Sequence, residues 1–217
     1  MANSDVKETL KEVIRTFPHY LSEQEKLSLF SELCNTSFNI DYYSESYTED
    51  ECLQGDVYIR FKVFDYKNNL VRDNVRGMVL SNTCDLSSEN RRMIGPNVVF
   101  CVVLKESQYT SFLKKNNLSS NQIYGHIKDV HEQRVTNRMY FPKRINSDSY
   151  IALLDEVYTM PLNLFWQQND RRRIFRLSNA GFYIFLMKLT LNFCRMSESI
   201  HRTPLSYFQS VENQEGK

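Results

Sequence analysis

The sequence lacks a net charge of either sign. Its 27 lysine and arginine residues are balanced by 26 aspartate and glutamate residues, which leaves a formal net charge of +1. A strong positive field over the whole surface, as in a dedicated nucleic-acid coat protein, is therefore excluded. Any binding of RNA or DNA must depend on local clusters of basic residues.

Long hydrophobic runs are also missing. Residues 1–17 contain no basic segment followed by an apolar one, so a secretory signal is not expected. The longest apolar stretch, residues 180–193, is too short to cross a bilayer and contains Lys188 and Asn192. We therefore expect a soluble protein with no membrane partner.

Cysteine and histidine occur without the spacing of a disulfide framework or a metal site. The five cysteines are an odd number with no CxxC pair. Of the four histidines, His126 and His131 are five residues apart on a predicted helix, which places them on different faces. We expect no metal, no cofactor and a reducing, cytoplasmic location.

Residues 1–36 are expected to form an N-terminal helical hairpin. Apolar residues recur at helical spacing from residue 5 to residue 17, where Pro18 ends the first helix. Ser22 and Glu25 form a capping box that begins the second helix. The next segment, residues 35–54, is rich in serine, tyrosine and acidic residues, which predicts a linker or a meandering strand.

From Gly55 the period of the apolar residues changes to two. Val57, Ile59, Phe61 and Val63 alternate with other residues, which predicts a strand with these four side chains on one buried face. Further strands are expected over residues 75–81, 97–104, 138–142 and 150–155.

Helices are expected between and after these strands. Residues 107–132 have helical character, with Ser119 or Ser120 as a cap, and Ser178 can cap a terminal helix that extends to about Met196. That terminal helix is apolar on nearly all sides, so we expect it to pack into the body of the protein. The pattern predicts an α+β domain over residues 55–200, followed by a flexible tail over residues 204–217.

Three stretches carry a family resemblance: QGDVYIRFKVF, NVRGMVLSN and GPNVVFCVVL. Their order and spacing from Gly55 to Leu104 are similar to the opening strands of the MazF/PemK family of toxin ribonucleases. The resemblance implies a small SH3-like β-barrel, to which the N-terminal hairpin, an inserted helix and a C-terminal packed helix are added. It also implies a bacterial or phage toxin or defence setting, in which such barrels commonly form homodimers.

The same resemblance implies a catalytic role for Arg76, which would stabilise the charge that develops on a phosphate during RNA cleavage. Two positions depart from the family pattern. Gly77 replaces the proline that follows the arginine, and Leu104 stands where the family has a catalytic threonine. Ser107 is the nearest hydroxyl to that missing threonine. The alternative interpretation is that Arg76 is a solvated arginine at the mouth of the barrel.

The segment from Ser81 to Asp85 supplies two further candidate catalytic hydroxyls, those of Ser81 and Thr83. We expect the chain to turn near Asn82, with Asp85 bonding backbone amides in the turn. Cys84 is then a buried small apolar residue. In the alternative, Cys84 is a nucleophile, which would require a neighbouring base or cation to lower the pKa of its thiol.

Local clusters of basic residues are candidates for nucleic-acid binding, since cations contact phosphates and nearby aromatic rings can stack on bases. The alternatives are solvated loops or a salt-bridged protein interface. The candidate residues are Arg91, Arg92, Lys143, Arg144, Arg171, Arg172, Arg173 and Trp166, and a further basic pair is Lys114 and Lys115.

Together, the residues and the resemblance predict a barrel protein that binds RNA, DNA or a partner protein and lacks the complete ribonuclease site. One alternative is an active, sequence-selective endoribonuclease that needs no metal. The other is a protein-interaction module with no role in nucleic-acid binding.

Overall fold

The computed structural model describes residues 22, 24, 41–45, 51–65, 68–87, 95–144, 147–168 and 170–193. The predicted N-terminal hairpin lies outside the described residues except at residues 22 and 24. Arg91, Arg92 and the predicted tail also lie outside them.

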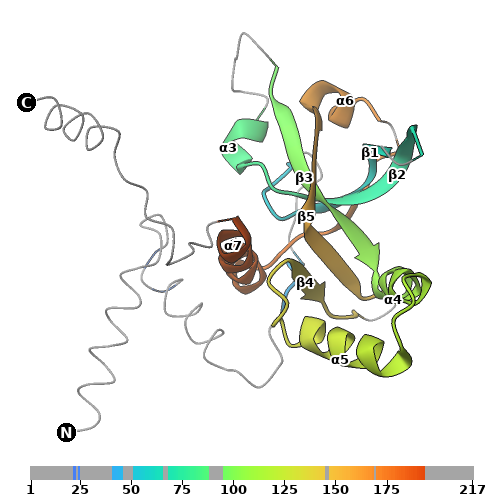
Figure 1. Ribbon diagram of the computed structural model, residues 1–217. Helices are drawn as coiled ribbons and strands as arrows, with labels where there is room; N and C mark the ends of the chain where they lie inside the picture. Colours follow the sequence, from blue (N-terminus) through green and yellow to red (C-terminus); the bar gives the residue numbers. More distant parts are fainter. Residues whose placement is uncertain are drawn as a thin grey trace, which may run out of the picture.

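The described chain combines antiparallel strands with helices, which confirms the predicted mixture of the two (Figure 1). The strands are β1 (Val57–Asp65), β2 (Leu70–Val79), β3 (Asn97–Lys105), β4 (Arg138–Phe141), β5 (Tyr150–Pro161) and β6 (Arg173–Phe175). The helices are α3 (Thr83–Leu86), α4 (Glu106–Lys115), α5 (Ser120–His131), α6 (Leu162–Trp166) and α7 (Asn179–Phe193). The strands form a six-stranded sheet in the order β4-β5-β3-β2-β1-β6.

The sheet is open at its two edges but strongly curled. No ladder among the described residues joins β4 to β6. Figure 1 shows β1 and β2 crossing the direction of β3 and β5. The ladder between β3 and β5 is interrupted after Val102↔Leu153 and resumes at Cys101↔Val157. Three extra residues of β5 therefore bulge out at this point, which bends the strand.

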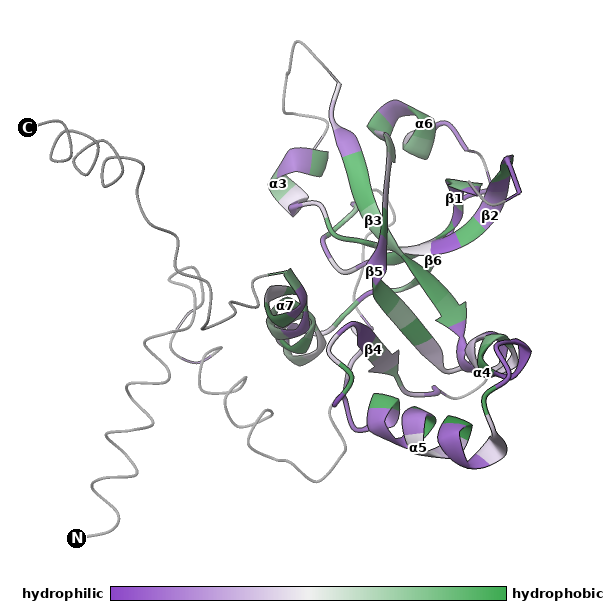
Figure 2. Cartoon of the chain, in the orientation of Figure 1, coloured by the Kyte–Doolittle hydropathy of each residue, from purple (hydrophilic) through white to green (hydrophobic). Residues whose placement is uncertain are grey.

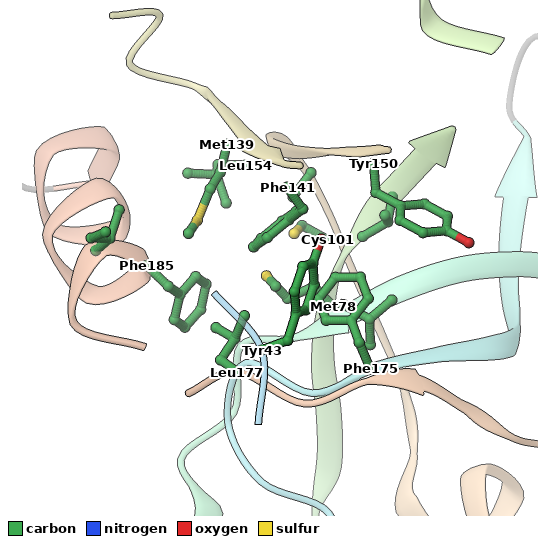
Figure 3. Packing of buried hydrophobic residues seen from close by; sticks show 14 residues of the cluster. Tyr43, Met78, Cys101, Met139, Phe141, Tyr150, Leu154, Phe175, Leu177 and Phe185 are labelled. Carbon is green, nitrogen blue, oxygen red and sulfur yellow. The ribbon is translucent and has the colours of Figure 1, made fainter. Parts of the chain in front are cut away.

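Every strand contributes side chains to one interior cluster, which lies against α7 (Figure 3). The rings of Phe141 on β4 and Phe175 on β6 are 5.1 Å apart between centroids, so the two edge strands meet through side chains. Figure 2 shows the hydrophobic residues concentrated along β3 and α7. The strand residues of this cluster include Val57, Met78, Cys101, Val103, Met139, Phe141, Tyr150, Ala152, Leu154 and Phe175.

Tyr43 fills the space between the two sheet edges. It forms an isolated bridge with Leu177, and its ring centroid lies 5.1 Å from that of Phe175. The Tyr43 hydroxyl donates a hydrogen bond to the Pro142 carbonyl at 2.5 Å. Residues 41–45, which belong to the expected linker, are therefore part of the core at Tyr43.

The predicted single buried face of β1 is wrong. Arg60 has a φ of +70°, and between Tyr58 and Phe61 strand β1 has one more residue than the paired segment of β2. This β-bulge shifts the alternation of side chains. Val57 consequently packs in the cluster against α7, whereas Phe61 and Val63 pack in a second cluster that includes Phe165 of α6. Ile59 is only partly buried.

A third cluster lies under α4 and α5, which form two helices where the sequence indicated one helical region. Ser119 caps α5 as predicted, because its Oγ accepts a hydrogen bond from the Gln122 amide. Ser178 likewise caps α7, with its Oγ accepting from the Gly181 amide at 3.1 Å. None of the helices in the described residues has the length and apolarity needed to cross a membrane.

Helix α7 is not buried on all sides. Met187, Leu191 and Phe193 are more than half exposed. Lys188, in contrast, is buried, and its ammonium group donates to the carbonyl oxygens of Val135 at 2.6 Å and Arg138 at 2.9 Å. Burial lowers the pKa of Lys188 to about 8.

Gly77 of β2 lies beneath two stacked aromatic rings. The centroids of Phe61 and Phe100 are 4.0 Å apart with an interplanar angle of 23°. A Cβ atom added at Gly77 would lie 2.5 Å from the Phe61 ring and 2.8 Å from the Phe100 ring. The packing of these two rings therefore requires glycine at this position.

We expect Gly77→Ala to lower the free energy of unfolding by about 1 to 3 kcal/mol, because the rings must move to admit the methyl group. The matched control is Gly125→Ala on α5, where an added Cβ meets no atom within 4 Å. That change should raise the free energy of unfolding by up to about 1 kcal/mol through helix propensity. Urea denaturation measures both, and equal effects of the two substitutions would contradict the packing described here.

Lys188 should make stability depend on pH. Its pKa of about 8 in the folded protein lies below the usual value of 10.5, so the unfolded chain binds more protons between these values. Stability therefore rises as the pH increases from 8 towards 10.5. Relative to Lys188→Met, the wild-type protein should gain about 2 to 3 kcal/mol between pH 7 and pH 10 by urea denaturation. A constant difference between the two proteins would show that Lys188 keeps an ordinary pKa.

Candidate nucleic-acid interface

Arg76 lies at the point where β2 approaches the start of α4. Its Nη2 donates to Oε1 of Gln108 at 2.6 Å, and the same oxygen accepts from the Lys105 amide at 3.2 Å. Gln108 therefore holds the arginine beside the first turn of the helix. Within the described structure Arg76 forms no ion pair, and its buried Nε has no hydrogen-bond partner. The guanidinium is thus positioned without a direct ion pair to a described carboxylate.

Two lysines lie close to this arginine. The Lys105 ammonium group is 2.6 Å from Oδ2 of Asp148. The hydrogen bond from Lys105 lowers the pKa of Asp148, and the charges of Lys105, Arg76 and Lys143 lower it further. Three cations therefore surround one carboxylate, which leaves an excess of positive charge. We call Arg76, Lys105, Gln108 and Lys143 the Arg76 surface.

The outward face of α4 continues from this surface. Five residues of the helix line a shallow hollow of about 360 Å³. Glu106, the acidic residue in the first turn, faces elsewhere, because its carboxylate contacts His131 Nε2 at 3.0 Å and accepts from the Ser149 hydroxyl at 2.6 Å. Among the described residues, the hollow is therefore lined without a carboxylate, by Ser107, Gln108, Ser111, Phe112 and Lys115.

Of the three candidate catalytic hydroxyls, only Ser107 adjoins Arg76. It is exposed and precedes Gln108, the partner of the arginine. Ser81 instead accepts a hydrogen bond from the Val99 amide at 2.8 Å, and Thr83 accepts one from the Gln54 amide at 3.0 Å. Both hydroxyls therefore stabilise the turn after β2.

The turn after β2 differs from the prediction in its details. The chain does turn near Asn82, but it is the Asn82 side chain that caps α3, with Oδ1 accepting from the Cys84 amide at 3.0 Å. Asp85 lies within the first turn of α3, and its bonds to backbone amides stay a prediction. Cys84 is exposed, so its predicted burial is wrong.

The three consecutive arginines do not form one phosphate-binding face. Arg171 places its guanidinium 3.4 Å from the ring centroid of Phe165, and burial lowers the pKa of Arg171 to about 10. Arg172 is exposed. The side chain of Arg173 is only 7% exposed, and its Nε lies 3.2 Å from Oδ2 of Asp56.

Asp56 and Arg176 are central residues that the sequence interpretation missed. Asp56 is 1% exposed and accepts two hydrogen bonds from Arg176, each of 3.0 Å. It also contacts Arg173, so one buried carboxylate serves two guanidinium groups. The signals in the sequence were the acidic residue at the start of a strand and the arginine within the apolar run IFRLS.

The remaining basic and aromatic candidates are divided between two regions. Lys143 and Arg144 are exposed, and Arg144 lies 5.1 Å above the ring of Tyr43. Trp166 is 43% exposed at the end of α6, packed edge-on against Phe165. Figure 1 shows α6 and α4 at opposite ends of the curled sheet. The structure therefore separates Trp166 from the Arg76 surface.

No protein-family model matches the chain, and no curated protein does so either. Within the part of the chain that the structure describes, no three histidine, cysteine, aspartate or glutamate side chains are grouped as a metal ion would require. The function must accordingly be inferred from the Arg76 surface itself.

The structure predicts opposite behaviour for two neighbouring arginines. Arg173→Ala should lower the free energy of unfolding by about 3 kcal/mol, because it removes one partner of a buried carboxylate. Arg172→Ala should change it by less than about 0.5 kcal/mol, because that side chain is exposed. Thermal or urea denaturation of both variants distinguishes them. Equal stability of the two variants would contradict the structural role of Arg173.

Proposed function

We propose that the protein binds nucleic acid through the Arg76 surface. The observation that carries this proposal is the geometry of Arg76, which Gln108 orients near Lys105 and Lys143 and which forms no direct ion pair among the described residues. A guanidinium group with free N–H donors is suited to phosphate oxygens, and the flanking ammonium groups add attraction for a polyanion.

We also infer that the curled sheet is a barrel of the MazF/PemK kind. The support is the resemblance of residues 55–104 together with the packing of Phe141 against Phe175 and of Tyr43 between the sheet edges. In this inference the edges are joined by side chains in place of backbone hydrogen bonds. Arg76 then occupies the position of the family's catalytic arginine, in a toxin or defence setting.

Binding without cleavage is favoured over ribonuclease activity. Cleavage of RNA needs a group that removes the proton from the attacking hydroxyl, and such a base is most effective when its pKa is near the working pH. The carboxylate on the Arg76 surface is Asp148, whose pKa is lowered by its cationic neighbours, so it is a weak base. Ser107 offers a hydroxyl but no base.

An endoribonuclease remains the second candidate because Ser107 directly precedes the residue that holds Arg76. In that case Arg76 would stabilise charge on the phosphate, and Ser107 would contact the reacting group. A third candidate, a module that binds an acidic protein, would use the same positive charges without any preference for nucleic acid.

We expect Arg76→Ala to weaken binding of a fluorescein-labelled 12-nucleotide RNA by about ten-fold or more, since it removes a charged hydrogen-bond donor. The slope of log K against log salt should fall by about 0.7 if one phosphate contact is lost. The control is Arg134→Ala, which removes an exposed arginine from a different part of the surface and should bind normally.

The same RNA is analysed for cleavage after incubation. Intact RNA together with the loss of affinity in Arg76→Ala supports binding alone. Cleavage by the wild-type protein that disappears in both Arg76→Ala and Ser107→Ala would contradict binding alone and support the ribonuclease hypothesis. Failure of the wild-type protein to bind any RNA or DNA at low salt would reject the proposed function.

A further inference from the structure

The hollow on α4 has a regular arrangement of side chains. Ser107, Ser111 and Lys115 follow one another at intervals of four residues, and Gln108 and Phe112 form a parallel row with the same spacing. Residues four apart lie above one another on a helix, so the two rows form one continuous strip. Successive residues of each row are about 6 Å apart along the helix axis. The strip begins at the Arg76 surface, because Gln108 belongs to both.

Phe112 gives this strip a flat apolar platform. Its side chain is 53% exposed, whereas Tyr109 and Leu113 on the inner face of the same helix are buried. A single exposed phenylalanine would need no explanation by itself. Here its neighbours in the hollow are two hydroxyls, an amide and an ammonium group. The Ser111 hydroxyl donates its proton to the Ser107 carbonyl at 2.8 Å, so it can only accept from a ligand that stacks on the ring, whereas the other groups can donate to it.

Positive charge is present at both ends of the strip. Lys105 and Arg76 lie at its start, and Lys114 and Lys115 lie in the last turn of α4. Ten residues separate Lys105 from Lys115, which corresponds to about 15 Å along the helix axis. A stacked strand with a rise of about 3.4 Å per nucleotide covers this length with roughly four nucleotides.

We propose that α4 is the track of a single-stranded RNA on this protein, with a base stacked on Phe112 and phosphates bound at the Arg76 surface and at Lys115. The hydroxyls of Ser107 and Ser111 and the amide of Gln108 then contact the ribose hydroxyls. This inference rests on the proposed function and deepens it. It assigns a binding role to an inserted helix that lies outside the family resemblance.

The arrangement selects a single strand over a duplex. Bases inside a duplex are stacked on one another and cannot present a face to Phe112, whereas unpaired bases can. An acidic peptide would satisfy the lysines, but it offers no flat ring system to the exposed phenylalanine. The strip therefore fits RNA better than it fits an acidic protein.

Fluorescence anisotropy with fluorescein-labelled U12 RNA tests the track. Phe112→Ala should weaken binding by roughly 5-fold to 100-fold, the loss that corresponds to one base stacked on an aromatic ring. Phe112→Trp should restore the affinity, because tryptophan also presents a flat ring. Lys115→Gln should lower the slope of log K against log salt by about 0.7, through the loss of one phosphate contact.

Helix α5 supplies matched controls. Tyr124 is an exposed aromatic residue and Lys128 an exposed lysine of that helix, and neither lines the hollow. Tyr124→Ala and Lys128→Gln should therefore bind U12 with wild-type affinity and salt dependence. Because all four positions are exposed on helices, unchanged circular dichroism is expected for each variant.

The outcomes separate this inference from the proposed function. If wild-type protein binds U12 and Arg76→Ala weakens binding while Phe112→Ala behaves like Tyr124→Ala, the Arg76 surface stands and the track along α4 is wrong. If a 12-base-pair duplex binds as tightly as U12, the stacking on Phe112 is likewise rejected. If no nucleic acid binds, or Arg76→Ala has no effect, the proposed function fails first. Tighter binding of U12 than of its deoxyribose counterpart supports the ribose contacts, and equal binding overturns them.

Discussion

The contact between Phe141 and Phe175 joins the two edges of the curled sheet through side chains. These residues belong to the two edge strands, β4 and β6, which are joined by no ladder in the described structure. Side-chain packing around Tyr43 must therefore hold the curl. The curl in turn places the site: β2 pairs with β3 only from Gly77 to Val79, so Arg76 is the first residue of β2 beyond that ladder. Because β3 leads directly into α4, the arginine meets Gln108 in the first turn of the helix.

Local patterns in the sequence predicted local structure well. The locations of the strands and the caps at Ser119 and Ser178 depend on residues that are neighbours in the chain. The prediction was wrong where contacts between residues distant in the chain determine the local structure. The bulge at Arg60 reflects pairing with β2, and the burial of Tyr43 depends on contacts with Phe175 and Pro142. The sequence analysis also selected Arg76 and Ser107 as candidates. The fold brings Arg76 to Gln108, the residue after Ser107, and no motif in the sequence had indicated this glutamine.

The arginines illustrate why a run of basic residues is a poor guide to a binding surface. Removing a guanidinium group from water is costly unless it gains a partner. Arg171 stacks on Phe165, while Arg173 shares the buried carboxylate of Asp56 with Arg176. These cations are committed to the fold. The cations that we propose for phosphate binding come from three separate segments and include Lys105, which pairs with Asp148 and belongs to no run of basic residues.

Helix α4, the platform of the proposed binding site, has an inner face that is fixed independently of any ligand. Tyr109 packs in the core beneath the helix, and its hydroxyl accepts from Arg138 Nε at 3.1 Å. When the imidazole of His126 is neutral and its Nε2 carries no proton, that hydroxyl can donate its own proton to Nε2, at 2.8 Å. Burial, assisted by the charge of Arg138, lowers the pKa of His126 and favours this state at neutral pH. The network ties α4 to α5 and β4, so a ligand on the outer face would not need to order the helix, and less of its binding free energy would be lost to ordering.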